Sequence, residues 1–324
     1  MPHYRILGLR VCCNEVLPHT ASVPVDGVDL HIELCGPGAG ANGPVCVYDV
    51  ERLVRSGPPA LFMSIGSGGD GRCVRLRYAD AHDHAEFVVG PGARHVWVTW
   101  SPGGRLQDVT TLLLGSVITC VLRLRGVLCL HAAVLELSGR AFALAGATGA
   151  GKSSTAAGLI RRGARLLADD VAAIACDASG LRVHGGPGSL RLHREVAEQV
   201  LCVEGPLPPL WSRAVSSKGF VDVARDAHSE VENGVPLAAV YVLAPRQATQ
   251  PWIETISARE SQPSLASLTS VRWVLDAAGR GDEFASLGRL ASAVPVRRVH
   301  RPDALERLDD VCTAILEDMH GVAG

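Results

Sequence analysis

The sequence predicts an α/β protein in which a β-rich region, residues 1–104, precedes a region of alternating strands and helices, residues 127–324. Three observations support this division. Short apolar runs separated by Gly-Pro and Gly-Gly turns fill the first region. A long apolar segment follows at 105–126, and helix-like and strand-like segments then alternate. We therefore expect a smaller β-rich domain, a connecting helix and a larger α/β domain.

The composition excludes several classes of protein. Apolar residues make up 47% of the 324 residues and charged residues 20%, which is enough for a substantial core and excludes general disorder. The formal net charge is −2 and the pI is near 6.6. No overall field draws such a chain onto nucleic acid or an anionic membrane, so we expect neither as a partner. The composition leaves a homo-oligomer open.

The ten cysteines are scattered and none forms a C-x-x-C pair. Residues 1–15 contain two arginines and lack the apolar stretch of a signal peptide, which predicts a cytoplasmic protein. We therefore expect reduced cysteines that act as small core residues rather than disulfide or zinc ligands. The uncharged apolar run 109–122 is about a dozen residues long, which suits a buried helix better than a membrane span.

The first region is predicted to be a set of short strands. Alternating or nearly alternating apolar residues indicate strands at 45–48, 73–78 and 95–100. Residues 106–124 have the wide apolar face of a helix and are followed by Gly126, a residue that commonly ends helices. That helix is placed to connect the two regions.

The second region alternates between the two kinds of element. Strands are predicted at 127–137, 140–145, 165–168, 171–176 and 237–243. Helices are predicted at 153–162, 263–278 and 303–319. The segment 178–236 is rich in turn residues and has no clear assignment.

A glycine loop follows the strand at 140–145 and matches the pattern G-x-x-x-x-G-K-[ST] in full. Glycines let such a loop curl so that its N–H groups face phosphate oxygens, and the next helix directs its positive end to the same place. Lysine adds a charge for the β- and γ-phosphates and serine a hydroxyl for Mg²⁺. The residues expected to bind nucleotide are Gly146, Thr148, Gly149, Ala150, Gly151, Lys152, Ser153 and Ser154.

Two adjacent acids, Asp169 and Asp170, end an apolar run about one helix and one strand after the loop. One carboxylate would serve Mg²⁺ and the other would accept a proton from an attacking hydroxyl. The alternative is an Asp-Asp turn between two strands. The chain has only two lysines, Lys152 and Lys218, and neither lies in an N-K-x-D motif, which excludes a conventional GTPase. No L-S-G-G-Q transporter signature is present.

Two further residues are candidates for the site. His131 lies in an apolar strand one hairpin before the loop, where it is either a core histidine or a side chain delivered to the phosphates. Lys218, the second lysine, is either an exposed loop residue or a mobile contact to nucleotide or acceptor.

The motifs resemble the catalytic domain of HPr serine kinase/phosphorylase. The shared features are the histidine of L-H-A, the loop G-A-T-G-A-G-K-S and the segment R-G-A-R-L-L-A-D-D, at His131, 146–153 and 162–170. The whole chain is similar to the HPr-kinase-like proteins of lasso peptide biosynthesis, through P-L-A-A-V-Y-V-L at 236–243 and V-P-V-R-R-V at 294–299.

The resemblance implies a fold like that of HPr kinase and phosphoenolpyruvate carboxykinase, and ATP- and Mg²⁺-dependent phosphorylation of a seryl hydroxyl. It implies that Asp169 is the general base and that Asp170 pairs with His131 or joins Ser153 in the metal shell. The chain departs from the family at Ala132, where the family has glycine, and in lacking R-G-L-G-I-[IV]. Glu195 and Glu204 are candidates for an additional metal carboxylate.

We therefore expect a serine kinase whose partners are ATP and a peptide or protein, with a lasso precursor as one candidate acceptor. Two alternatives remain open. A kinase for a free amino acid or sugar would need no peptide, and a nucleotide-binding regulator would transfer phosphate only to water.

Overall fold

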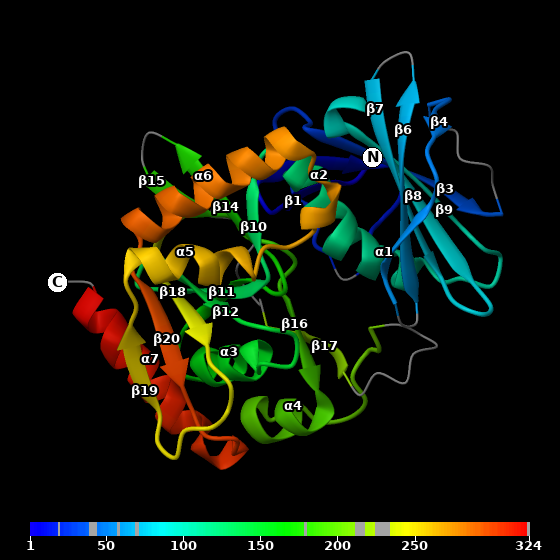
Figure 1. Ribbon diagram of the computed structural model, residues 1–324. Coiled ribbons are helices and arrows are strands. Elements are labelled where there is room, and N and C mark those ends of the chain that lie inside the picture. Colours follow the sequence, from blue (N-terminus) through cyan, green and yellow to red (C-terminus); the bar gives the residue numbers. More distant parts are fainter. Residues whose placement is uncertain are drawn as a thin grey trace.

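The computed structural model describes residues 1–18, 20–38, 44–56, 59–68, 71–177, 180–210, 218–223 and 234–322. Two large sheets lie on either side of a helix, and further helices cover the second sheet (Figure 1). A mixed α/β architecture with several sheets is confirmed. Whether the boundaries of 104 and 127 delimit separate domains stays a prediction.

The first sheet is built by residues 3–100 in the order β1-β2-β3-β9-β8-β7-β6-β4, with β5 also paired to β6. Only the β2–β3 and β3–β9 pairs are parallel. Period-two alternation explains these strands; in β3, for example, Leu30, Ile32 and Leu34 are buried. The strands are β1 (His3–Ile6), β2 (Leu9–Cys13), β3 (Leu30–Pro37), β4 (Val47–Tyr48), β5 (Arg52–Arg55), β6 (Ala60–Gly68), β7 (Gly71–Ala79), β8 (His84–Val89) and β9 (His95–Trp100).

The second sheet has the order β10-β14-β15-β18-β12-β11-β13, and β20 joins β18 to β19. The neighbours β12, β18 and β20 run parallel. Its strands are β10 (Leu128–Leu130), β11 (Ala132–Leu137), β12 (Arg140–Ala145), β13 (Arg165–Ala168), β14 (Ala172–Asp177), β15 (Gly180–Val183), β18 (Val235–Leu243), β19 (Trp252–Thr255) and β20 (Val296–His300). A separate hairpin consists of β16 (Ser189–His193) and β17 (Lys218–Asp222).

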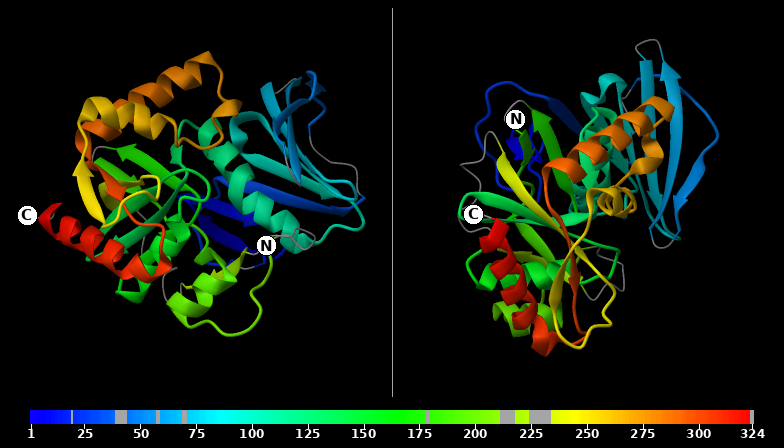
Figure 2. Two further views of the ribbon diagram at one scale, coloured as in Figure 1. Left: turned by 60° about the horizontal axis from the view of Figure 1, so that its bottom comes forward. Right: turned by 60° about the vertical axis from the view of Figure 1, so that its left-hand side comes forward.

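The connecting helix is continuous from Leu106 to Leu124, as α1 (Leu106–Leu112), a π-helical turn (Leu113–Val117) and α2 (Ile118–Leu124). It lies between the two sheets (Figures 1 and 2). By length and composition it could cross a membrane, but 61% of its most apolar window is buried inside the protein. Its apolar side chains therefore serve the core in this structure.

Two buried clusters use opposite faces of the second sheet. In β12, Ala141, Ala143 and Ala145 belong to the cluster that includes the first sheet and the connecting helix, whereas Phe142 and Leu144 belong to the cluster on the other side.

The helices that follow the connecting helix are α3 (Lys152–Arg161), α4 (Arg194–Leu201), α5 (Ala258–Ala266), α6 (Ala277–Ala293) and α7 (Leu308–Val322). Short 3-10 turns lie at Pro91–Ala93, Arg272–Val274 and Leu305–Arg307.

Several predictions for the second region need correction. The strand expected at 127–137 is two strands, β10 and β11, that separate at His131 and pair with different neighbours. The helix expected at 263–278 is wrong. The capping box of Ser257 and Glu260 begins α5 at residue 258, and α6 begins anew at 277 after Asp276 caps it. The last helix begins at 308 rather than 303.

The expectation for the cysteines is also wrong for one pair, because the structure joins Cys46 and Cys73 in a disulfide. The eight other cysteines are free. Five of the eight are buried as expected, Cys12, Cys13, Cys120, Cys129 and Cys312.

Candidate functional site

The glycine loop leaves the carboxyl end of β12, a strand buried between β11 and β18, and leads into α3. Gly151 has φ +85°, and a Cβ at this position would lie 3.0 Å from Nη2 of Arg246. Both the left-handed backbone and the close guanidinium therefore require glycine here. Arg246 donates to the carbonyl of Gly149 at 3.2 Å, and Arg301 donates to that of Ala150, so two arginines brace the loop from outside.

Lys152 begins α3 and is 6% exposed. Its ammonium donates to the carbonyls of Gly146 at 2.9 Å and Ala147 at 3.1 Å. Burial lowers the pKa of Lys152, while the nearby Asp170 and Asp169 raise it. The lysine is thus held inside the curl of the loop.

Asp169 links the glycine loop to the β16–β17 hairpin. One carboxylate oxygen lies 3.4 Å from the Ser153 hydroxyl and accepts the N–H of Asp170 at 3.0 Å; the other accepts the N–H of Arg191 at 2.8 Å. Burial, followed by the charge of Asp170, raises the pKa of Asp169 to about 6. A carboxyl with that pKa is a better proton acceptor than an ordinary aspartate.

Asp170 has a different environment although it is the next residue. Its φ of +68° turns its side chain away from that of Asp169, and it forms an ion pair with Arg191. His131 Nδ1 lies 3.1 Å from the Asp170 carbonyl. Burial would raise the pKa of Asp170, but Arg191, His131 and Lys152 together lower it. Burial and then Lys152 lower the pKa of His131. These shifts favour a charged Asp170 beside a neutral histidine.

Two cavities meet at these residues. The first, the loop cavity, has a volume of about 330 Å³ and is lined by Arg55, His131, Thr148, Gly149, Gly151, Lys152, Ser153, Ser154, Asp170, Arg191 and Lys218, among others. The second, the large cleft, has a volume of about 960 Å³. It shares several of these residues and extends along the connecting helix to β5 and β6 of the first sheet. The two cavities therefore share His131, Asp170 and Lys218 among their lining residues.

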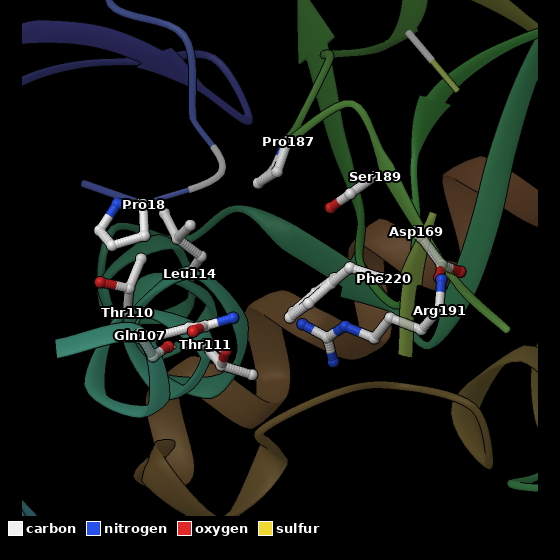
Figure 3. Close-up of a pocket in the computed structure, with 10 residues that line it drawn as sticks. All are labelled: Pro18, Gln107, Thr110, Thr111, Leu114, Asp169, Pro187, Ser189, Arg191 and Phe220. Atoms are coloured by element: carbon white, nitrogen blue, oxygen red, sulfur yellow. Dashed lines mark hydrogen bonds between the residues drawn. The ribbon is translucent and has the colours of Figure 1, made fainter. Parts of the chain in front are cut away.

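A smaller third cavity, the side pocket, lies between the connecting helix and the segment 187–191 (Figure 3). Asp169 lines this pocket and not the loop cavity, whereas Asp170 lines the loop cavity together with Lys152. The two adjacent acids thus face different spaces. Asp169 nevertheless stays in reach of Ser153, which lines the loop cavity.

The structure brings most of the predicted site residues together. Lys152, Ser153, Asp170, His131 and Lys218 line one cavity. Gly146 lines the adjoining large cleft, and the N–H of Ala150 donates to the carbonyl of Ala147.

The two candidate metal glutamates lie apart from this group. Glu195 and Glu204 are exposed, and neither lines the three cavities described above.

The sequence offers Arg191 only as one of several arginines that would suit a phosphate or an acidic peptide, and it does not mark Arg55. Arg191 lines all three cavities, and Arg55 reaches the loop cavity from β5 of the first sheet. No spacing or motif marks either residue in an arginine-rich chain. In the sequence L-R-L-H at 190–193, apolar and polar residues alternate, and Leu190 and Leu192 are buried. This alternation predicts a strand with Arg191 on its less buried face.

The oxygen ligands at the loop suit a hard divalent cation. The Ser153 hydroxyl and the carboxylates of Asp169 and Asp170 are the donors that Mg²⁺ prefers. Within the described ranges, no group of three or more His, Cys, Asp or Glu side chains is arranged to hold a metal without other ligands. A magnesium site here would therefore need phosphate oxygens or water, as is usual for this ion.

Part of the chain is similar to proteins named HPr kinase/phosphorylase. It is 38% identical over 93 residues to HPr kinase/phosphorylase from Clostridium botulinum strain Eklund 17B, covering 28% of this chain and 29% of that protein. It is 38% identical over 89 residues to the protein of the same name from strain Alaska E43, covering 27% of each. The chain thus spans less than a third of the length of these relatives. No family model matches it.

A solved structure of HPr(Ser) kinase/phosphatase from Coxiella burnetii aligns with 60% of this chain and 99% of that one, at 15% identity and a TM-score of 0.34. A likeness at that level carries no further argument. These partial sequence matches confirm the resemblance to HPr kinase/phosphorylase that the motifs indicate. The resemblance to the proteins of lasso peptide clusters stays a prediction.

Proposed function

We propose that the chain is an ATP-dependent kinase that transfers the γ-phosphoryl group to a seryl hydroxyl of a peptide or protein. The observation that carries this proposal is the meeting of Lys152, Ser153 and Asp170 in one cavity, with Asp169 in contact with Ser153. The similarity to proteins named HPr kinase/phosphorylase supports it. The motif resemblance makes a lasso precursor peptide the acceptor to test first.

The residues of the site have different roles in the proposed in-line phosphoryl transfer. N–H groups of the loop and the Lys152 ammonium would hold the phosphates, and the ammonium would exchange its carbonyl partners for phosphate oxygens. When bound at Ser153 and Asp170, Mg²⁺ would neutralise the charge that develops on the phosphate oxygens. Arg191 and Lys218, which line the same cavity, add positive charge beside them.

Proton transfer is assigned to Asp169. As the acceptor oxygen bonds to the γ-phosphorus, its proton passes to the Asp169 carboxylate, and the bond from phosphorus to the β–γ bridging oxygen breaks to release ADP. The raised pKa of Asp169 suits this role, whereas Asp170 is held charged by Arg191. Asp170 would instead stay on the phosphate side, with His131 against its backbone.

The test incubates the protein with γ-labelled ATP, Mg²⁺ and serine-containing peptides, lasso precursors among them, and reads label and mass shift. We expect label on a peptide serine. Asp169→Asn should retain ATP binding and lower transfer at least about a hundredfold, since general-base catalysis contributes that much or more. Asp310→Asn, an exposed aspartate of α7, is the matched control and should leave the rate unchanged.

Other results would point to the alternatives. Label found only in free phosphate identifies a nucleotide-binding regulator. Label on a free amino acid or sugar without any peptide identifies a small-molecule kinase. Transfer that survives Asp169→Asn unchanged would show that Asp169 is not the base.

A further inference from the structure

The loop cavity holds more cations than acids. Within the described part of the chain, its lining includes one carboxylate, that of Asp170, and five cationic side chains, Arg55, Lys152, Arg191, Lys218 and Arg246. Like charges in one partly enclosed space repel one another, and an anion with several charges relieves that repulsion. The cations compete for one acid, and in the structure Arg191 is the one that pairs with it.

Arg191 combines a fixed backbone with a long side chain. Its N–H donates to the Asp169 carboxylate at 2.8 Å, and the pairing of β16 with β17 places it opposite Phe220. The side chain extends from the strand toward the connecting helix (Figure 3). There a Cβ at Gly115 would lie 3.7 Å from Nη2, so the helix leaves room for the guanidinium where it has no side chain. The guanidinium can therefore change its partner while the strand stays in place.

Asp170 has two uses that compete with each other. In the structure its carboxylate forms an ion pair with Arg191, and the two side chains are 31% and 23% exposed. The proposed function assigns the same carboxylate, with Ser153, to Mg²⁺. A guanidinium and a divalent cation on one carboxylate repel each other, and water screens half-buried groups only in part. Arg191 is therefore expected to leave Asp170 when the metal binds.

The proposed reaction supplies another anion for Arg191. Arg191, Asp170 and Lys152 line the same cavity, so a guanidinium released from Asp170 stays beside the phosphates that Lys152 would hold. Phosphoryl transfer spreads negative charge over three equatorial oxygens. The planar fork of arginine donates two parallel hydrogen bonds to such oxygens, which an ammonium cannot do. Arg191 therefore suits the γ-phosphoryl group better than either lysine of the cavity.

We propose that Arg191 exchanges partners in the reaction, leaving Asp170 when Mg²⁺ and ATP bind and donating to the oxygens of the transferring γ-phosphoryl group. This inference rests on the proposed function and adds an ordered change of contacts to it. The acceptor oxygen gives its proton to Asp169 and bonds to the γ-phosphorus, and the bond to the bridging oxygen breaks to release ADP. Arg191 gains no proton and forms no covalent bond, but stabilises the charge on the equatorial oxygens.

The first test measures the Mg²⁺ requirement with ADP, which lacks the γ-phosphoryl group. Calorimetry of ADP binding over a range of Mg²⁺ concentrations gives the concentration at which half of the Mg²⁺ effect is reached. In Arg191→Gln this concentration should be about fivefold lower than in the wild type, because a competing cation has been removed. Arg194→Gln, which changes an exposed arginine paired with Glu198, is the matched control and should follow the wild type. An equal or higher concentration in Arg191→Gln would show that Arg191 only orients Asp170, and would overturn the exchange.

The second test measures transfer to a seryl peptide at saturating Mg²⁺ and ATP. Arg191→Gln should lower kcat at least about a hundredfold, because it removes a charge aimed at the transferring group. Arg191→Lys should recover part of that loss, with a kcat about tenfold below the wild type, because it keeps the charge without the fork. Thermal unfolding shows whether each variant is folded, and Arg191→Lys carries the test if Arg191→Gln is not.

The outcomes separate this inference from the proposed function. A folded Arg191→Gln that labels the peptide at the wild-type rate would overturn the role of Arg191 and leave the kinase proposal intact. If the wild type labels no peptide, the proposed function fails, and the contact of Arg191 with the γ-phosphoryl group fails with it, whatever the ADP titration gives.

Discussion

The two sheets differ in how their strands end, and this difference decides where chemistry can be placed. In the second sheet, β12, β18 and β20 run parallel, so their carboxyl ends share one edge, and the glycine loop, Arg246 and Arg301 follow those ends. In the first sheet most neighbours are antiparallel, and the residues that directly follow its three parallel strands, β2, β3 and β9, line neither the loop cavity nor the large cleft. Ligand sites in α/β proteins occur at the carboxyl edge of parallel strands.

The first sheet instead supplies a wall. Arg55 and Leu61 from β5 and β6 border the large cleft, and the connecting helix forms another side. One region thus carries the groups proposed to react, while the other limits what can reach them. If this division is right, substitutions in the second sheet should change the rate of reaction, and substitutions in the first sheet should change affinity or stability.

The largest expected effect separates the two lysines of the chain. Lys152→Met should lower kcat about a thousandfold, because it removes a preorganised charge from the phosphate site. Lys218→Met, in the same cavity but on the hairpin, should lower kcat about tenfold or less. Steady-state kinetics with the acceptor peptide measure both. Similar losses of kcat in the two variants would show that the loop lysine has no larger part in the reaction than the hairpin lysine.

The next effect concerns the ion pair that joins the connecting helix to α6. Arg123 and Glu283 are 3% and 1% exposed, and Arg272 Nε lies 2.9 Å from the second oxygen of Glu283. Glu283→Ala should lower the free energy of unfolding by about 3 kcal/mol, because it leaves a buried guanidinium unpaired. Urea denaturation measures the change. Glu254→Ala, in a more exposed pair with Arg298, should have a much smaller effect.

A smaller effect is expected at an ion pair of the first sheet. Hydrogen bonds from Arg10 lower the pKa of Asp29 to about 2. Because this pKa lies below the ordinary value near 4, the pair stabilises the fold above that pH, and its contribution is lost as the pH falls towards 2. Asp29→Asn should cost about 1 kcal/mol at neutral pH after solvent screening.

The pH dependence provides the control for that prediction. Between pH 4 and pH 2 the free energy of unfolding should fall less steeply in Asp29→Asn than in the wild type, and Glu198→Gln in an exposed helix pair should follow the wild type. Equal slopes for all three proteins would contradict the role of Asp29.

The smallest effect tests the contribution of the first sheet to the loop cavity. Arg55 is exposed, so its charge is well screened, and Arg55→Gln should raise the Kd for ATP about threefold. Arg52→Gln, on the same strand and paired with Asp49, should leave the Kd unchanged. Calorimetry compares the two variants. If Arg55→Gln changes kcat without changing the Kd for ATP, the assignment of affinity to the first sheet and of rate to the second is contradicted.

The parts of the fold that could be predicted are those with strong local signals. The β12–loop–α3 unit is readable because an apolar strand, a glycine pattern and a helix follow one another without a gap. The helix α6 was missed because Gly279, Gly281 and Gly288 lower its local preference, and tertiary packing supplies the stability instead. The pairing order of the strands depends on contacts distant in sequence, so local patterns do not contain it.

The candidate site was predictable to the extent that motifs define it. Lys152, Ser153 and the acid pair could be named from spacing, whereas the different spaces that Asp169 and Asp170 face depend on a left-handed backbone at residue 170. Thr111 and Arg191 line the same cavities only because the connecting helix packs against the hairpin. Neither packing partner has a sequence pattern that indicates the other.

The buried cluster that includes Phe87 of the first sheet, Val117 of the connecting helix and Val240 of the second sheet decides how this chain can be shortened. Deleting residues 1–104 would uncover the apolar flank of the connecting helix that packs against the first sheet. Apolar surface of that kind drives aggregation when it is left exposed. A fragment built around the glycine loop would therefore need an engineered cover to remain in solution, and truncation is a poor route to a minimal enzyme.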